Sequence, residues 1–243
     1  MTRKTLGIFC HGGAFRAAYV NGFLKCVEEN NIKVDRLIGV SAGFYAVFSH
    51  LAGVNDREIW TRDLDSPMYN SLTKFNVFRE FVDFHTSKIL ERSPYTEAQI
   101  LSRMEKCSAI ATRFWGWKHD VLGNFKSIDE IKDASLATGS IPWFLLTFPH
   151  KFREHRYIDG GFRLKNLFDY LSTDIKVAII PASSAKDLSD PGYMGEGLFG
   201  YINDYPDKLR TFLSGEPEDY LLLWDKGYED AKKFVSDLKL VTG

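Results

Sequence analysis

The amino-acid sequence predicts an α/β fold: a three-layer sandwich in which a mostly parallel central sheet carries helices on both faces. The chain has 243 residues, of which 44% are hydrophobic and 26% charged, so it can bury a sizeable core. Strand-like and helix-like patterns alternate twice near the N-terminus, which implies parallel strands joined by right-handed crossovers. No repeat or linker interrupts the sequence. We therefore expect residues 1–243 to form a single domain.

Two strand-helix units begin the chain. Residues 5–10 are apolar and end near a glycine pair, and apolar residues then recur with helical spacing over residues 20–27. Residues 36–40 form the second expected strand, and helical spacing returns over residues 44–51. The chain therefore turns from a buried strand into a buried helix at about residue 41.

The remaining elements follow from weaker patterns. Residues 56–93 are rich in aromatic side chains but only weakly periodic, and we expect an irregular helical insertion or a lid there. A serine-proline pair at residues 93–94 and a capping-box pattern from Ser127 to Glu130 each predict the start of a helix. An amphipathic pattern predicts a last helix over residues 227–240. Strands are also expected at residues 109–114, 152–158, 175–181 and 220–224.

Composition excludes several classes of protein. The formal net charge is −1 and no basic run alternates with aromatic residues, so nucleic acid is not expected as a partner. The three widely spaced cysteines fit a reducing, cytoplasmic location, and the first apolar run is too short for a signal peptide. Neither a metal nor another cofactor is expected, because the His, Cys, Asp and Glu residues show no ligand spacing.

Residues 39–43 read G-V-S-A-G and match the G-x-S-x-G pattern of serine hydrolases. Small residues on both sides of Ser41 permit a tight bend that presents the hydroxyl group, and the following helix N-terminus favours negative charge nearby. The alternative is a glycine-rich turn without any chemistry. The apolar strand before the turn and the periodic helix after it favour a nucleophilic Ser41.

An anion-receiving loop is predicted at the end of the first strand. Gly12, Gly13 and Ala14 can point their backbone N–H groups into one space, and the helix after Arg16 adds its positive end. This loop should open at the same sheet edge as Ser41. The alternative is an ordinary strand-to-helix turn. The loop matches neither the dinucleotide-binding pattern nor the P-loop pattern.

The histidines restrict the choice of catalytic base. An α/β-hydrolase triad has the order serine, acid, histidine, and none of the six histidines follows Asp159. Asp159 ends a predicted strand and precedes two glycines, so its carboxylate could approach a hydroxyl closely. By itself, however, the Asp-Gly pair is read more simply as an ordinary turn.

Together, the loop at residues 12–16, the G-x-S-x-G turn and the Asp-Gly-Gly at residues 159–161 resemble the patatin-like phospholipases in their order and spacing. The resemblance implies that Ser41 and Asp159 form a catalytic dyad without histidine. It implies a lipid acyl hydrolase of the phospholipase A or lysophospholipase type, with a phospholipid or lysolipid substrate and an acyl-serine intermediate. Gly12, Gly13 and Ala14 would then form the oxyanion hole.

Other segments agree with the family pattern or depart from it. Residues 137–144 are similar to its A-S-x-x-x-P-x-x-F segment, Asn166 is placed like the asparagine after the D-G-G motif, and residues 224–228 look like its strand-to-helix ending. Two positions depart from the glycines that the family usually has, and the Cβ atom of alanine restricts positive φ there. These two residues are Ala14 and Ala17.

Substrate contacts and competing functions remain open from the sequence. Arg16, Pro142, Trp143 and Phe144 are expected to contact substrate. The uncharged run at residues 134–148 could line an acyl groove, touch a membrane surface peripherally, or pack in the core. A non-lipid esterase, a thioesterase or an acyltransferase could use the same dyad. A non-catalytic lipid-binding or scaffolding relative is the alternative outside enzymes.

Overall fold

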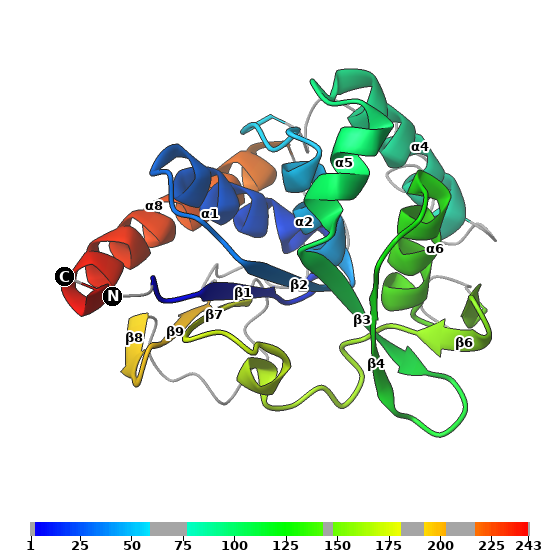
Figure 1. Cartoon of the computed structure of the whole chain (residues 1–243). Coiled ribbons are helices and arrows are strands. Elements are labelled where there is room, and N and C mark those ends of the chain that lie inside the picture. The colour runs from blue at the N-terminus through cyan, green and yellow to red at the C-terminus, as the bar shows by residue number, and fades with distance from the viewer. Residues whose placement is uncertain (1–2, 59–76, 143–147, 181–191, 203–216, 243) are drawn as a thin grey trace.

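The computed structural model describes residues 3–58, 77–142, 148–180, 192–202 and 217–242 (Figure 1). These residues build a nine-stranded sheet with the order β5-β6-β3-β2-β1-β7-β9-β8, and β4 pairs with β3 outside this path. The strands are β1 (Leu6–Cys10), β2 (Arg36–Val40), β3 (Cys107–Arg113), β4 (His119–Gly123), β5 (His150–Phe152), β6 (His155–Ile158), β7 (Ile175–Ile180), β8 (Gly192–Gly195) and β9 (Leu198–Ile202).

The centre of the sheet is parallel. β1 pairs with β2 and β7, β2 pairs with β3, and β7 pairs with β9, all in parallel. The antiparallel pairs lie toward the two ends, where β4 and β6 join β3, β5 joins β6, and β8 joins β9. Cys10 pairs with Gly39, and Val40 pairs with Ile110. The loops that follow β1 and β2 therefore open at the same edge.

The two faces of the sheet are covered unequally. Figure 1 shows the labelled α-helices together on one side of the sheet. They are α1 (Ala17–Glu29), α2 (Ala42–Leu51), α4 (Val77–Arg92), α5 (Glu97–Met104), α6 (Ile128–Gly139) and α8 (Pro217–Thr242). The other face is covered partly by the 3-10 helix η2 (Leu167–Tyr170) and its neighbours Leu164 and Leu171. The predicted mostly parallel sheet flanked by helices is confirmed, with a thinner second cover.

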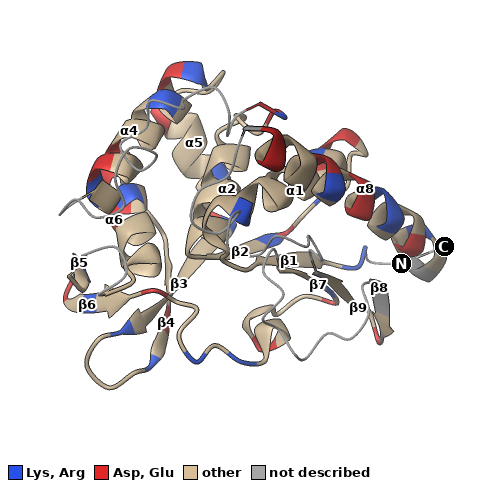
Figure 2. Cartoon of the chain, turned by 180° about the vertical axis from the view of Figure 1, so that it is seen from behind, with Lys and Arg blue, Asp and Glu red and all other residues tan. Residues whose placement is uncertain are grey.

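Alternation along β1 explains why its residues are apolar without a break. Ile8 and Cys10 pack into the helix-side core, whereas Phe9 packs with Ile38 and Val40 on the other side. A strand buried on both faces needs apolar residues at odd and even positions alike. On the outer surface, by contrast, acidic and basic bands follow α4 and α8 (Figure 2).

The strand predicted near the C-terminus was wrong, whereas the helix predicted after it is confirmed. Residues 220–224 are not a strand, and together with residues 227–240 they belong to the single helix α8. Gly227 suggested a boundary, but its role is close packing: a Cβ atom there would lie 2.0 Å from the Tyr19 carbonyl oxygen, and one at Gly22 would lie 2.0 Å from that of Trp224. Two glycines thus let α1 and α8 cross with their backbones in contact.

Several boundaries also differ from the prediction. Residues 152–158 contain a hairpin of β5 and β6 rather than one strand, with Arg153 at a φ of 51° in its turn. The helix expected from residues 93–94 begins at Glu97 with a capping box from Thr96. Of the expected insertion at residues 56–93, α4 is described, whereas residues 59–76 lie outside the described part. None of the described helices combines the length and apolar character needed to cross a membrane.

Candidate active site

Ser41 occupies the turn between β2 and α2 and is the N-cap residue of α2, with φ 54° and ψ −134°. A positive φ is unfavourable for a serine and costs on the order of 1–3 kcal/mol when the surrounding structure imposes it. As the N-cap residue, the serine lies at the N-terminal end of α2, where the helix dipole favours negative charge. The predicted strand-to-helix context of Ser41 is confirmed.

Two glycines make this turn sterically possible. A Cβ atom at Gly39 would lie 2.2 Å from Cα of Phe44, and one at Gly43 would lie 2.3 Å from the backbone oxygen of Cys10. Both distances are far below van der Waals contact, so neither position accepts a larger residue without backbone movement. Close packing alone is therefore enough to explain why both positions of the G-x-S-x-G pattern are glycine.

Thr138 holds the turn from the other side. The backbone N–H of Ser41 donates to the Thr138 hydroxyl at 2.9 Å, and that hydroxyl donates to the backbone oxygen of Ile110 in β3. The Ser41 amide is thus engaged and does not serve as an oxyanion donor in this arrangement. Thr138 lies in a segment that the sequence singles out, but its contact with Ser41 joins residues 97 positions apart and depends on the fold.

Asp159 reaches the same place from an antiparallel strand. It follows β6, whose Ile158 pairs with Thr112. The backbone N–H of Asp159 donates to the backbone oxygen of Ser140 at 2.7 Å, and the backbone oxygen of Asp159 accepts from the Thr112 hydroxyl at 3.0 Å. A Cβ atom at Gly160 would lie 2.0 Å from the Ile110 oxygen, so the chain presses against β3 at the level of Val40.

The carboxyl group of Asp159 is buried, with 6% of the residue exposed. Burial raises the pKa of Asp159 to about 6, and hydrogen bonds from the Ser41 hydroxyl and the Gly161 amide oppose this rise. Oδ1 accepts the Gly161 N–H at 2.7 Å. Oδ2 has no hydrogen-bond partner of ordinary geometry among the described residues, so the contact with Ser41 is long or poorly aligned. A carboxylate with this pKa can accept a proton at neutral pH.

The glycine loop lies against Ser41. A Cβ atom at Gly12 would come within 2.6 Å of Cβ of Ser41, so only glycine permits this approach. Gly13 precedes the 3-10 helix η1 (Ala14–Arg16), and Ala14 has a φ of 50°. Alanine thus occupies a left-handed conformation in which glycine would be unstrained. The structure brings the three expected oxyanion residues to the edge that carries Ser41.

The four expected substrate contacts are placed unequally. Arg16 is buried, with 5% of the residue exposed, at the start of α1. Pro142 is buried as well. Trp143 and Phe144 lie outside the described residues. Neither described residue of this group extends into solvent as a free binding side chain.

His11 lies beside the site without a direct bond to either of its central groups among the described contacts. Its Cε1 atom would be 3.9 Å from a Cβ atom on Gly161, and its Nδ1 atom lies 3.1 Å from the Gly12 oxygen. Burial lowers the pKa of His11, so the ring is mainly neutral at pH 7. Its backbone N–H donates to Ile179 at 2.9 Å and anchors the loop to β7. These contacts favour a structural role for His11.

The chain is similar to members of one protein family. The family model for patatin-like phospholipases matches residues 9–172. Human patatin-like phospholipase domain-containing protein 2 is 20% identical over an alignment 253 positions long, covering 96% of this chain and 48% of the relative. Human 1-acylglycerol-3-phosphate O-acyltransferase PNPLA3 is 27% identical over 159 residues, covering 62% of this chain and 32% of the relative. The chain spans about half the length of the first relative and about a third of the second.

A solved structure shows the same fold. VipD from Legionella pneumophila superposes with a TM-score of 0.52 and 10% identity, over 97% of this chain and 67% of VipD. At so low an identity the likeness concerns the fold alone.

Proposed function

Because the chain belongs to the patatin-like phospholipase family, we propose that it is a lipid acyl hydrolase of the phospholipase A or lysophospholipase type. One observation carries the proposal: the buried carboxyl group of Asp159 lies beside the hydroxyl of Ser41 at a strained strand-to-helix turn. A nucleophile needs a base within reach and donors for the oxyanion, and we expect residues at this sheet edge to provide both.

The proposed reaction has two halves. Asp159 accepts the proton of the Ser41 hydroxyl while Oγ attacks the ester carbonyl carbon, and backbone N–H groups of Gly12, Gly13 and Ala14 receive the oxyanion. The tetrahedral intermediate expels the alcohol, which takes the proton from Asp159. Water then attacks the acyl-serine, again with Asp159 as base, and releases the fatty acid and free Ser41.

Acyl transfer is the second candidate function. The name of one relative describes an O-acyltransferase that acts on 1-acylglycerol-3-phosphate. The same acyl-serine would serve this chemistry if a lipid hydroxyl replaced water in the second half. Product analysis separates the two, because hydrolysis releases free fatty acid, whereas transfer yields a diacyl product from a labelled monoacyl acceptor.

We further propose a peripheral membrane contact through the β3–β4 hairpin. Trp115 and Trp117 in its turn are 78% and 46% exposed. Since Val40 pairs with Ile110, β3 continues past the end of β2 and carries these residues beyond the edge with Ser41. Tryptophan favours the interface between water and lipid. Trp115→Ala should weaken binding to phosphatidylcholine vesicles several-fold. The control variant Leu240→Ala, which removes an exposed apolar side chain on α8, should bind like the wild type. Unchanged vesicle binding by Trp115→Ala would contradict the proposed contact.

A fluorophosphonate probe tests the hydrolase directly. We expect it to label the wild type but not Ser41→Ala, and we expect each His→Ala variant to keep most of the labelling and ester turnover. Thermal unfolding of each variant checks that it is folded. Equal labelling of wild type and Ser41→Ala would refute the assignment of the nucleophile.

A further inference from the structure

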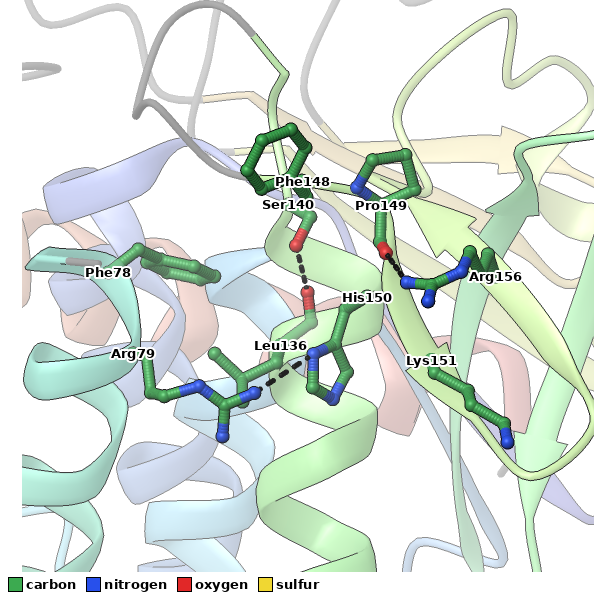
Figure 3. Close-up of a pocket in the computed structure, with 9 residues that line it drawn as sticks. All are labelled: Phe78, Arg79, Leu136, Ser140, Phe148, Pro149, His150, Lys151 and Arg156. Atoms are coloured by element: carbon green, nitrogen blue, oxygen red, sulfur yellow. Dashed lines mark hydrogen bonds between the residues drawn. The ribbon is translucent and has the colours of Figure 1, made fainter. Parts of the chain in front are cut away.

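A second polar feature lies next to the proposed base. A pocket of about 290 Å³ opens between α4, α6 and the β5–β6 hairpin (Figure 3). This volume lies just below the range of about 300–1,000 Å³ that is common for small-molecule sites. It suits a headgroup rather than a whole lipid. The lining residues are Phe78, Arg79, Leu136, Ser140, Phe148, Pro149, His150, Lys151 and Arg156.

The pocket concentrates positive charge. Figure 3 shows Arg79 and Arg156 on opposite sides of His150, the first on α4 and the second on β6. Lys151 is the third cation of the lining. Within the described part of the chain, none of these three cations forms a salt bridge with a carboxylate. Three cations and one small pocket favour a ligand with more than one negative charge.

A hydrogen-bond chain orients Arg79 without a direct carboxylate partner among the described residues. Nη2 of Arg79 lies 3.4 Å from Nδ1 of His150, and Nε2 of His150 lies 2.9 Å from Oδ1 of Asp133. Burial lowers the pKa of His150, so the neutral ring can accept from Arg79 while it donates to Asp133. The carboxylate thus acts on the imidazole and not directly on the guanidinium.

Arg156 is held in a comparable way. Its Nη1 donates to the backbone oxygen of Pro149 at 3.0 Å, which fixes the guanidinium, and its other N–H donors have no hydrogen-bond partner within the described part of the chain. Guanidinium groups bind phosphate through paired hydrogen bonds that match its geometry. Two oriented guanidinium groups therefore fit a phosphate group better than a single-charged carboxylate.

The apolar part of the lining selects a lipid phosphate over a free ion. Phe148 is 71% exposed, and Phe78 and Leu136 also line the pocket. An exposed aromatic ring gains free energy when a hydrocarbon chain covers it. Ser140 connects the pocket with the proposed base, because it lines the pocket and its backbone oxygen accepts the N–H of Asp159.

We infer that this pocket binds the phosphate group of a lipid headgroup, with Arg79 and Arg156 as its principal ligands. The inference rests on the proposed function, since the acyl ester of that lipid would be the bond that Ser41 cleaves. Arg79 and Arg156 would then determine specificity for phosphate-bearing lipids over neutral acylglycerols.

Binding to the Ser41→Ala chain tests the pocket without turnover. Calorimetric titration compares a short-chain lysophosphatidate, the monoacylglycerol with the same chain, and inorganic phosphate. We expect lysophosphatidate to bind at least about tenfold more tightly than either of the others, because it alone offers phosphate and hydrocarbon together. Arg79→Gln with Arg156→Gln should remove that preference. Lys88→Gln, which changes the charge of α4 outside the pocket, should keep it.

Each contrary outcome has a distinct meaning. If lysophosphatidate does not bind, or if the double Arg variant binds it as tightly as the chain with both arginines, the pocket assignment is overturned. This holds even if Ser41 is the nucleophile. Inorganic phosphate that binds as tightly as lysophosphatidate would overturn the lipid headgroup as ligand. Ester hydrolysis retained by Ser41→Ala would refute the proposed function instead, and the binding result would be read independently of it.

Discussion

Two glycine-containing turns meet at one edge of the sheet, and they differ in how tightly the structure determines them. The turn at residues 39–43 is confined by Phe44 on one side and by the backbone after β1 on the other, and both of its glycines are sterically required. The loop after β1 needs glycine at Gly12 but carries alanine at φ 50° two residues later. Packing therefore determines the residues of the nucleophile turn. The proposed oxyanion loop, by contrast, holds an alanine at a positive φ that its Cβ atom disfavours.

Gly43→Ala should break the nucleophile turn and have the largest effect on stability. The new Cβ atom would lie 2.3 Å and 2.6 Å from the backbone oxygens of Cys10 and His11, which cannot move without disturbing both turns. We expect a loss of about 3 kcal/mol in the free energy of unfolding, measured by urea denaturation. Gly116→Ala is a matched control, because no heavy atom of the described residues other than its chain neighbours lies within 4 Å of its new Cβ, although its φ of 90° adds a smaller strain. A smaller loss in Gly43→Ala than in Gly116→Ala would contradict the packing argument.

Thr138→Val should loosen the same turn without adding bulk. It removes the acceptor of the Ser41 N–H and the donor to the Ile110 oxygen. One part-buried and one buried backbone group would lose their partners, so we expect a loss of about 2 kcal/mol in the free energy of unfolding. We also expect kcat for ester hydrolysis to fall about tenfold, because a small displacement of a nucleophile is costly.

Thr138→Ser is the control for the Thr138 prediction, since it retains the hydroxyl. Thr138→Ser should recover most of kcat, as it can still hold the Ser41 amide. If Thr138→Val and Thr138→Ser had the same kcat, the hydroxyl would not position the nucleophile.

Ala14→Gly should have the smallest effect and should relieve strain in the oxyanion loop. Replacing alanine at φ 50° by glycine should raise the free energy of unfolding by about 0.5–1 kcal/mol, visible in urea denaturation. Catalytic turnover should be retained, because the backbone N–H at this position remains. Destabilisation by Ala14→Gly would show that the alanine side chain, rather than the backbone, holds the loop.

The sequence predicts those parts of the site that depend on strand order and local turns. Ser41 and the loop at residues 12–14 follow consecutive parallel strands, so periodicity places them at one edge. The contacts of Thr138 and the pairing of β6 with β3 join distant residues, and no local pattern contains them. Gly227 led to a wrong helix boundary, because a glycine that allows close packing of a second helix has the same sequence pattern as a glycine at a helix end.

Stability also reports on the charge of Asp159. Its folded pKa of about 6 is raised above the unfolded value, so the buried carboxylate destabilises the fold above pH 6 and this cost vanishes as pH falls toward 4. Asp159→Asn should therefore stabilise the protein at pH 8, by up to about 3 kcal/mol, and have little effect at pH 4. Urea denaturation at both pH values measures this difference and shows whether the variant is folded.

The most direct test of the account is the pH dependence of kcat/KM for ester hydrolysis in the wild type and in Asp159→Asn. Because Asp159 acts as a base in its ionised form, wild-type kcat/KM should fall about tenfold per pH unit below pH 6 and level off above it. Asp159→Asn should lose at least about a thousandfold of this activity at pH 8. A folded Asp159→Asn variant that hydrolyses esters with the wild-type rate and the same acid limb would contradict the Ser41–Asp159 dyad.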